Sequence, residues 1–214
     1  MDSAADATLS QPLPRPRRGG STRVRFAGGE LVLEATRGGH ALLWLDGTRS
    51  RRFALGLAAE GELRVCLAAP RLPVRVVTRD TLTLAPKSRL HGYVQVPLVP
   101  MLFWHAPGAA LQRLVELPRD ELAAEWDDRD GTVYRCTSPF HVRYPVPAPT
   151  PRANVPVWLA NPTETTASPG YVPLLLRDED LRELRGGIAT APVRLRWTGH
   201  ALAAVARPRT EVPL

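Results

Sequence analysis

The chain has 214 residues, of which 28 are basic and 21 acidic, so its formal net charge at pH 7 is +7. This length is sufficient for one large β domain or for two small ones, each with its own hydrophobic core. No segment approaches the roughly 20 apolar residues of a membrane-spanning helix, and Met1–Ser10 lacks the apolar run of a secretory signal. We therefore expect a cytoplasmic protein without a transmembrane segment.

Proline and glycine are frequent, with 22 and 16 residues, which is typical of many short strands joined by turns. Lys87 is the only lysine, so arginine carries almost all of the positive charge. A genome of high GC content explains this bias. A surface for phosphates or acidic partners explains it as well, because guanidinium groups pair with such anions through two hydrogen bonds at once. The two explanations are compatible.

The two cysteines, Cys66 and Cys136, are far apart and lack the C-x-x-C spacing of zinc and redox sites. A disulfide across a sandwich is one arrangement open to them, but no signal peptide directs the chain to an oxidising compartment. We therefore expect two buried free thiols, no metal and no cofactor.

Residues 1–20 are rich in proline and arginine, with Pro12, Pro14 and Pro16 at alternate positions. Such a segment buries too little apolar surface to offset the entropy lost on ordering. We expect a disordered leader.

Residues 21–117 are predicted to form a first β-sandwich unit. Four short runs rich in apolar residues lie between residues 21 and 57, the first of them alternating, and the last two are separated by the pair Asp46-Gly47. Short apolar runs between turn residues indicate strands, and an Asp-Gly pair is a strong hairpin signal. These residues are therefore predicted to be a four-stranded meander, and residues 62–67 a further strand.

The stretch from Pro73 to Pro100 contains two alternating runs on either side of a turn at Pro86. Such runs around a proline-containing turn predict a pair of antiparallel strands. Residues 101–105 are apolar and predict a continuation of the second strand or a buried loop. Residues 111–117 fit a short helix or a strand.

Residues 118–210 are predicted to form a second β-sandwich unit. Two strands are expected around the charged turn Asp130-Gly131, and alternate prolines at residues 145–151 favour an extended linker. Residues 178–185 have the clearest helical pattern in the chain, with Asp178 as a candidate cap. A short likeness between residues 93–98 and 171–176 leaves open whether the two units are repeats.

These patterns together predict an all-β fold of one or two immunoglobulin-like antiparallel β-sandwich units with little helix.

No catalytic pattern is present. The carboxylates between residues 121 and 130 lack the calcium-loop pattern, so we interpret them as a solvated hairpin tip. His91 and His105 flank the second central strand, but a zinc site there needs a third ligand that the sequence does not identify. No serine or cysteine stands in a recognisable nucleophile motif. We expect no catalytic residues and a protein that is not an enzyme.

Arginines interleaved with aromatic residues are the one positive signal for binding. If the strands that carry them adjoin, they form a basic sheet face of the kind that binds single-stranded nucleic acid or RNA. Arginine on the polar face of a strand also protects a sheet edge from unwanted pairing. The candidate partner-binding residues are Arg23, Arg25, Arg49, Arg51, Arg52, Arg194, Arg196 and Trp197.

The segment from Pro73 to Leu98, PVRVVTRDTLTLAPKSRLHGYVQVPL, resembles the central part of the uncharacterised "domain of unknown function 432" family. The later Asp130-Gly131-x-x-Tyr134 and Asn161-x-Thr163 segments fall where that family has a strand and an N-x-T turn. The resemblance covers roughly residues 25–205. It implies an all-β, immunoglobulin-like protein of unknown role, and it brings no catalytic residues.

Three functions remain open. The first is a protein-interaction or scaffold module, which includes a homo-oligomer, since an exposed apolar run such as residues 101–104 needs covering. The second is nucleic-acid binding through the arginine-bearing face. The third is a metal-dependent hydrolase, which requires His91, His105 and a carboxylate to meet in one pocket.

Overall fold

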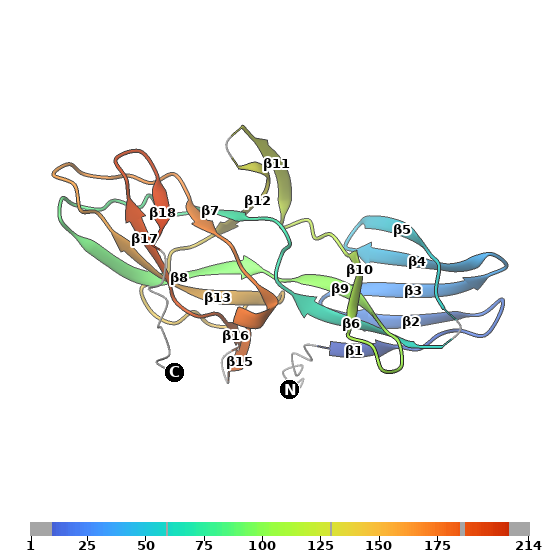
Figure 1. Ribbon diagram of the computed structural model, residues 1–214. Coiled ribbons are helices and arrows are strands. Elements are labelled where there is room, and N and C mark those ends of the chain that lie inside the picture. The colour runs from blue at the N-terminus through green and yellow to red at the C-terminus, as the bar shows by residue number, and fades with distance from the viewer. Residues whose placement is uncertain (1–9, 59, 129, 185–186, 206–214) are drawn as a thin grey trace. The chain divides into compact units, whose positions relative to one another are not determined.

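The computed structural model describes residues 10–58, 60–128, 130–184 and 187–205 (Figure 1). These residues form strands, turns and one short 3-10 helix, and no α-helix occurs among them. Several of their sheets are antiparallel. The prediction of an all-β fold with little helix is confirmed.

The chain forms two compact units, and each is assembled from separate stretches of sequence. Among the described residues, unit 1 comprises those up to Ala69, Pro97–Leu122 and Ala148–Pro151, and unit 2 comprises Pro70–Val96, Ala123–Pro147 and those from Arg152 onward. This division differs from the expected contiguous units, 21–117 and 118–210. It differs because Pro70–Val96 supplies strands to the sheets of unit 2 rather than unit 1.

The first sheet of unit 1 is the predicted meander. Its neighbouring strands are all antiparallel, in the order β2-β3-β4-β5. Gly47 has a φ of 58°, the left-handed conformation that the turn after Asp46 needs and that glycine adopts without strain. The strands are β2 Ser21–Phe26, β3 Gly29–Thr36, β4 Gly39–Asp46 and β5 Arg49–Leu55.

One face of this sheet is buried in the core of unit 1. Leu31, Leu42 and Trp44 are fully buried on it. The indole of Trp44 lies against Gly29, where a β-carbon would come within 2.2 Å of the ring, so a larger residue does not fit there. Nε1 of Trp44 donates a hydrogen bond to the Pro118 carbonyl at 3.0 Å, which satisfies the buried indole donor.

The second sheet of unit 1 is antiparallel in the order β1-β6-β9-β10. The expectation that residues 101–104 form an exposed apolar run is wrong. These residues lie in the interior strand β9, and all four side chains are buried. Residues 112–116, for which the sequence fitted either a short helix or a strand, form a strand. The strands are β1 Ser10–Leu13, β6 Glu62–Ala68, β9 Val99–His105 and β10 Gln112–Glu116.

The expected disordered leader is partly ordered. Residues 1–9 lie outside the described residues, but Ser10–Leu13 forms the edge strand β1, paired with β6. Leu13 is 1% exposed. Burial of this single apolar side chain stabilises a strand in a segment whose composition predicted disorder. Ser10 accepts a hydrogen bond from the Cys66 thiol at 3.2 Å. Neither cysteine forms a disulfide; Cys136 is buried as expected, whereas Cys66 is only half-buried.

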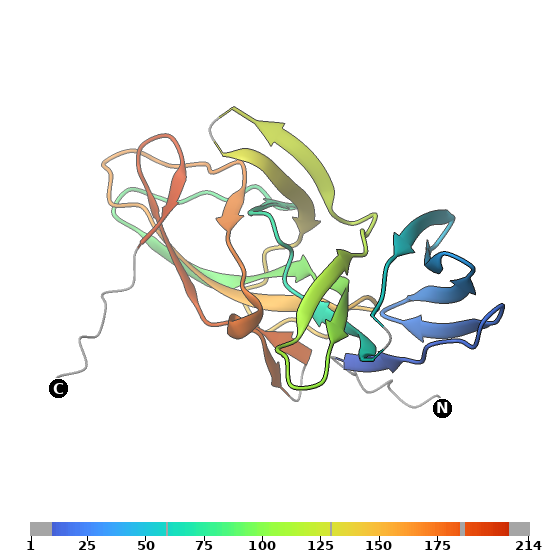
Figure 2. The same cartoon turned by 45° about the vertical axis from the view of Figure 1, so that its right-hand side comes forward.

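The first sheet of unit 2 has the order β11-β12-β7-β14. β11 and β12 are the two predicted strands around the Asp130-Gly131 turn, and they run side by side as a two-stranded arm (Figure 2). β12 pairs with β7 in parallel, which a purely antiparallel sandwich does not contain. The strands are β11 Ala123–Asp127, β12 Gly131–Ser138, β7 Val74–Thr78 and β14 Val172–Leu174.

The second sheet of unit 2 is built around β13. Its order is β15-β16-β13-β17-β18, with β8 also paired to β13. β13 is parallel to both β16 and β17. The strands are β8 Arg89–Pro97, β13 Arg152–Ala160, β15 Arg182–Leu184, β16 Gly187–Ala189, β17 Val193–Trp197 and β18 Leu202–Ala204.

The two strands predicted around Pro86 exist as β7 and β8, but they are not partners. β7 lies between β12 and β14, whereas β8 pairs with β13, so the two strands belong to different sheets. The intervening residues are held by a bridge between Leu84 and Ala167 instead of a hairpin. Pairing with distant strands therefore replaces the local pairing that the sequence predicted.

The prediction of a helix at residues 178–185 is also wrong for residues 178–184, the part of this segment that the structure describes. Asp178–Asp180 forms one 3-10 turn, without a side-chain cap, and Arg182–Leu184 is strand β15. The segment lacks a buried apolar face, because none of the residues in the 3-10 turn is buried and β15 is exposed throughout. Strand pairing with β16 therefore prevails over local helical preference.

Candidate functional site

An exposed row of side chains crosses the second sheet of unit 2 at Trp158. The His91 ring on β8 stacks on the indole, with the ring centroids 5.0 Å apart and the planes 17° apart. The Arg194 guanidinium on β17 lies 4.7 Å from the centroid of the same indole. β13 lies between β8 and β17, so the indole has a partner on each neighbouring strand.

Strand alternation produces this row. Val157 and Leu159 are buried on the core side of β13, so Trp158 between them faces outward and is 40% exposed. On β17, Leu195 is buried and Arg194 points to the same side as Trp158. The parallel register places Trp158 directly opposite Arg194.

Two pockets meet at Trp158 and Arg194. The first, here called the arginine pocket, has a volume of about 430 Å³ and combines basic and apolar side chains. It contains no carboxylate among its lining residues. These are Arg89, His91, Trp158, Leu159, Ala160, Arg194, Leu195 and Val205.

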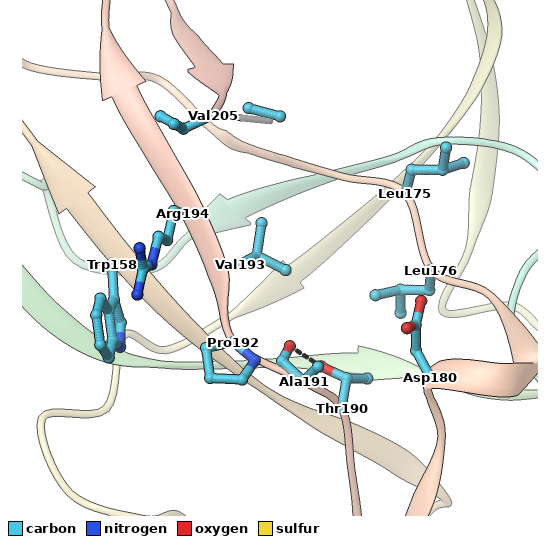
Figure 3. A pocket seen from close by; sticks show the side chains of 11 residues that line it. Trp158, Leu175, Leu176, Asp180, Thr190, Ala191, Pro192, Val193, Arg194 and Val205 are labelled. Atoms are coloured by element: carbon cyan, nitrogen blue, oxygen red, sulfur yellow. Dashed lines mark hydrogen bonds between the residues drawn. The ribbon is translucent and has the colours of Figure 1, made fainter. Parts of the chain in front are cut away.

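The second, here called the apolar pocket, has a volume of about 520 Å³ and is shown in Figure 3. Trp158 and Arg194 lie together on one side of it, and Leu175, Leu176 and Asp180 lie across from them. Leu175 is 60% exposed and Val205, which lines both pockets, is 47% exposed. An exposed cluster of apolar side chains of this kind is a common mark of an interaction site.

The charge at the junction is positive. Arg89, Arg194 and Arg196 form no ion pair with any described residue, and Arg194 is instead held over the indole. A guanidinium stacked on an aromatic ring keeps its outer N–H groups available for a carboxylate or a phosphate. The junction therefore offers an oriented anion-binding group beside an apolar hollow.

The predicted binding residues of unit 1 do not gather into one basic face. β2 and β5, which carry them, lie at opposite edges of their sheet with β3 and β4 between them. Three of these arginines pair with acidic residues. The pairs are Arg23–Glu30 at 3.3 Å, Arg52–Glu34 at 3.0 Å and Arg49–Asp120 at 2.9 Å. Arg25 and Arg51 are exposed.

The predicted residues of unit 2 lie on β17. Arg194 lines both pockets. Arg196 lies two residues further along β17, opposite Ala160, and Trp197 is half-buried opposite Leu202. Trp158 and Arg89 are site residues that the sequence patterns did not indicate. The sequence contains no alternation signal for Trp158, because residues 155–160 are a continuous apolar run in which the outward-facing residue is not marked.

Four of the five carboxylates in the 121–130 cluster, all except Asp128, are engaged by arginines or by a threonine. Glu125 pairs with Arg135 at 3.2 Å, and Glu121 accepts a hydrogen bond from Thr150. Asp127 and Asp130 both bind Arg75.

The two central histidines have separate surroundings. His91 belongs to the Trp158 row of unit 2, and His105 ends β9 of unit 1, opposite Glu62. No group of three potential metal ligands occurs in the part of the chain that the structure describes. A metal-dependent hydrolase stays a prediction.

Comparison of the chain with protein-family models, with curated proteins and with solved structures finds no match. In the ranges that the structure covers, no helix has the length and apolar character needed to cross a membrane.

Proposed function

We propose that this protein is an interaction module, and that unit 2 binds a partner polypeptide segment carrying an acidic side chain next to a large apolar one. The stack of Arg194 on Trp158, at the junction of the two pockets, is the observation that carries the proposal. The acidic group would pair with Arg194 and Arg89, and the apolar group would enter the apolar pocket.

The surroundings of Trp158 favour a polypeptide over a small molecule. Pockets for small molecules enclose most of the ligand surface, whereas Trp158, Leu175 and Val205 remain well exposed around these pockets. Tryptophan and arginine are also the residue types that most often dominate protein–protein binding energy. A chain segment lying across the sheet face covers such a row without needing a closed cavity.

The same geometry argues against base stacking as the main contact. Single-stranded nucleic acid binds largely by stacking its bases on free aromatic faces. His91 and Arg194 approach the Trp158 indole from the two neighbouring strands and so occupy its ring system. The arginines without ion pairs still favour phosphate contacts, so nucleic-acid binding is the second candidate.

The proposal is tested by selecting peptides from a random library on the purified full-length protein. We expect the selected sequences to share an acidic residue close to a Trp, Phe or Leu. Binding should weaken at least about tenfold, or about 1.4 kcal/mol, in the Arg194→Glu and Trp158→Ala proteins. Both residues are exposed, so neither change should unfold the protein.

Arg25→Glu is the matched control, because it reverses an exposed arginine on β2 of unit 1. It should bind the selected peptides as the wild type does. Selected peptides without acidic residues, or peptides that bind Arg194→Glu equally well, contradict the proposal.

The second candidate is tested with a fluorescent single-stranded oligonucleotide over a series of salt concentrations. Binding through phosphates falls with salt, by a slope of about 0.7 per phosphate contact on logarithmic axes. Steep salt dependence that is reduced in Arg194→Glu, together with failure of the peptide selection, would favour nucleic acid. The immunoglobulin-like arrangement and the family resemblance stay predictions, and neither carries the proposal.

A further inference from the structure

The β11–β12 arm of unit 2 presents a tryptophan that no packing explains. Trp126 on β11 is 75% exposed, and β11 is the edge strand of its sheet. Four of the five β11 residues are exposed. A solvent-exposed indole on an edge strand is an apolar surface, and no described residue covers it.

The arm is fixed at its turn. Arg75 donates to Asp127 at 2.6 Å and to Asp130 at 2.7 Å, and its guanidinium lies 4.8 Å from the centroid of the Tyr171 ring. The turn that follows Trp126 is therefore anchored to β7 before any partner binds. A pre-ordered anchor loses little conformational entropy on binding, which favours a binding role for the exposed indole.

The arm and the site described above are complementary in chemistry. The apolar pocket, at about 520 Å³, has room for an indole and is lined by Leu175, Leu176 and Val205. Asp128, two residues after Trp126, is exposed and forms no ion pair with a described residue. Arg194, at the edge of the pocket, is a cation that likewise forms no ion pair with a described residue. An indole followed closely by a carboxylate is the type of segment that the site is proposed to bind.

We propose that the site of one copy of this chain binds the β11–β12 arm of a second copy. Trp126 enters the apolar pocket, and the Asp128 carboxylate pairs with Arg194. The inference rests on the proposed function, because it identifies a second copy as the occupant of the same site.

The contact joins two different surfaces of unit 2. It therefore closes into a dimer when each copy gives its arm to the other, and it extends head to tail when the orientation does not close. Either assembly contains the same arm-in-pocket contact, so a test of that contact does not depend on the symmetry.

The test measures the mass of the full-length protein by light scattering and sedimentation at protein concentrations from about 1 µM to 1 mM, a range that spans weak to tight association. We expect concentration-dependent assembly of the wild type. Trp126→Ala and Arg194→Glu should each be monomeric over the range in which the wild type assembles. Arg25→Glu, the matched control, should assemble as the wild type does.

Mixing the two monomeric variants gives the decisive result. The Arg194→Glu copy keeps its arm and the Trp126→Ala copy keeps its pocket, so an equimolar mixture has one intact contact per pair and should form 1:1 dimers. Charge exchange adds an independent check, because assembly lost in Arg194→Asp should return in the double variant Arg194→Asp, Asp128→Arg.

Three outcomes overturn the inference. They are a wild type that stays monomeric at all concentrations, a mixture in which both folded variants remain monomers, and an Arg194→Glu protein that assembles normally. Arg194-dependent binding of acidic peptides by a monomeric wild type would leave the proposed function standing without self-association. Absence of both peptide binding and assembly would overturn both.

Discussion

Nη1 of Arg75 lies 2.6 Å from Oδ2 of Asp127, and Nη2 of the same guanidinium lies 2.7 Å from Oδ2 of Asp130. One largely buried arginine thus holds both sides of the β11–β12 turn. The two hydrogen bonds raise the pKa of Arg75 further above its already high value, and the guanidinium stays charged at any pH at which the protein folds.

Replacing this arginine should loosen the arm. In Arg75→Lys a single ammonium cannot reproduce the two-pronged contact, so one carboxylate loses its partner. We expect the free energy of unfolding to fall by about 2 kcal/mol, the range of charged hydrogen bonds in partly buried positions. Urea denaturation measures the change.

Arg135→Lys is the control for this substitution. Arg135 pairs with Glu125 at 3.2 Å, but both side chains are well exposed, so the change should stay within about 0.5 kcal/mol. Equal losses in the two variants would mean that Arg75 acts only as a surface charge.

A second prediction concerns Asn161, which is 1% exposed and lies just after β13. Its side-chain amide donates to the carbonyls of Leu84, Ala85 and Thr165 at 3.1, 3.0 and 2.8 Å. Its Oδ1 accepts hydrogen bonds from the backbone N–H and the hydroxyl of Thr163. The amide thus joins two segments of unit 2, residues 84–85 and residues 161–165.

In Asn161→Asp, a carboxylate that donates nothing would face three carbonyl oxygens. We expect a loss of about 3 kcal/mol or more at pH 7, because a buried charge loses its solvation and its donors. Burial should raise the pKa of the new carboxyl, so the variant's deficit against the wild type should shrink as the pH falls. Denaturation at pH 7 and pH 5 tests both points, and a deficit that grows on acidification contradicts the argument.

The sequence predicted those parts of the fold that depend on neighbours in the chain. The meander of β2 to β5 follows from short apolar runs and from turn pairs such as Asp46-Gly47, which act locally. The pairing of β7 with β12 and of β13 with β17 joins strands far apart in sequence, and alternation does not specify the partner of a strand.

The same reason limits prediction of the site. The sequence predicts Arg194 as a binding residue from its place near Trp197, but the aromatic ring that it stacks on is Trp158. Only the register of β13 with β17 brings these two residues together. Register also removed candidates, since Arg23 and Arg52 pair with Glu30 and Glu34 of the intervening strand β3. The sequence shows which residues are charged, but the pairing of strands in the sheet decides which arginines form ion pairs.

Unit 1 should lose stability on mild acidification because of His40. Burial lowers the pKa of His40 below 6.5, and the charge of Arg15 lowers it further. The unfolded chain therefore takes up the proton at a higher pH than the folded chain, so stability is complete above about pH 6.5 and falls as the pH decreases through that value. Denaturation between pH 7.5 and 5.5 measures the slope.

His40→Gln should reduce that slope, because a glutamine does not titrate. The exposed His200→Gln serves as the control and should leave the slope unchanged. A slope that is identical in the His40→Gln protein and the wild type would assign the acid sensitivity to other groups.

The edge strand β1 provides the last prediction. Leu13 is 1% exposed at the end of β1, opposite Leu63, and is the main apolar group that fixes this strand to unit 1. Leu13→Ala should lower the free energy of unfolding by about 2 to 4 kcal/mol, as for other buried leucines, and should speed hydrogen exchange of the β6 amides beside β1. Pro12→Ala, at an exposed neighbouring position, should change stability by less than about 0.5 kcal/mol. If Leu13→Ala behaves like Pro12→Ala, β1 is a loosely attached strand and the leader is closer to the disordered segment that its composition predicted.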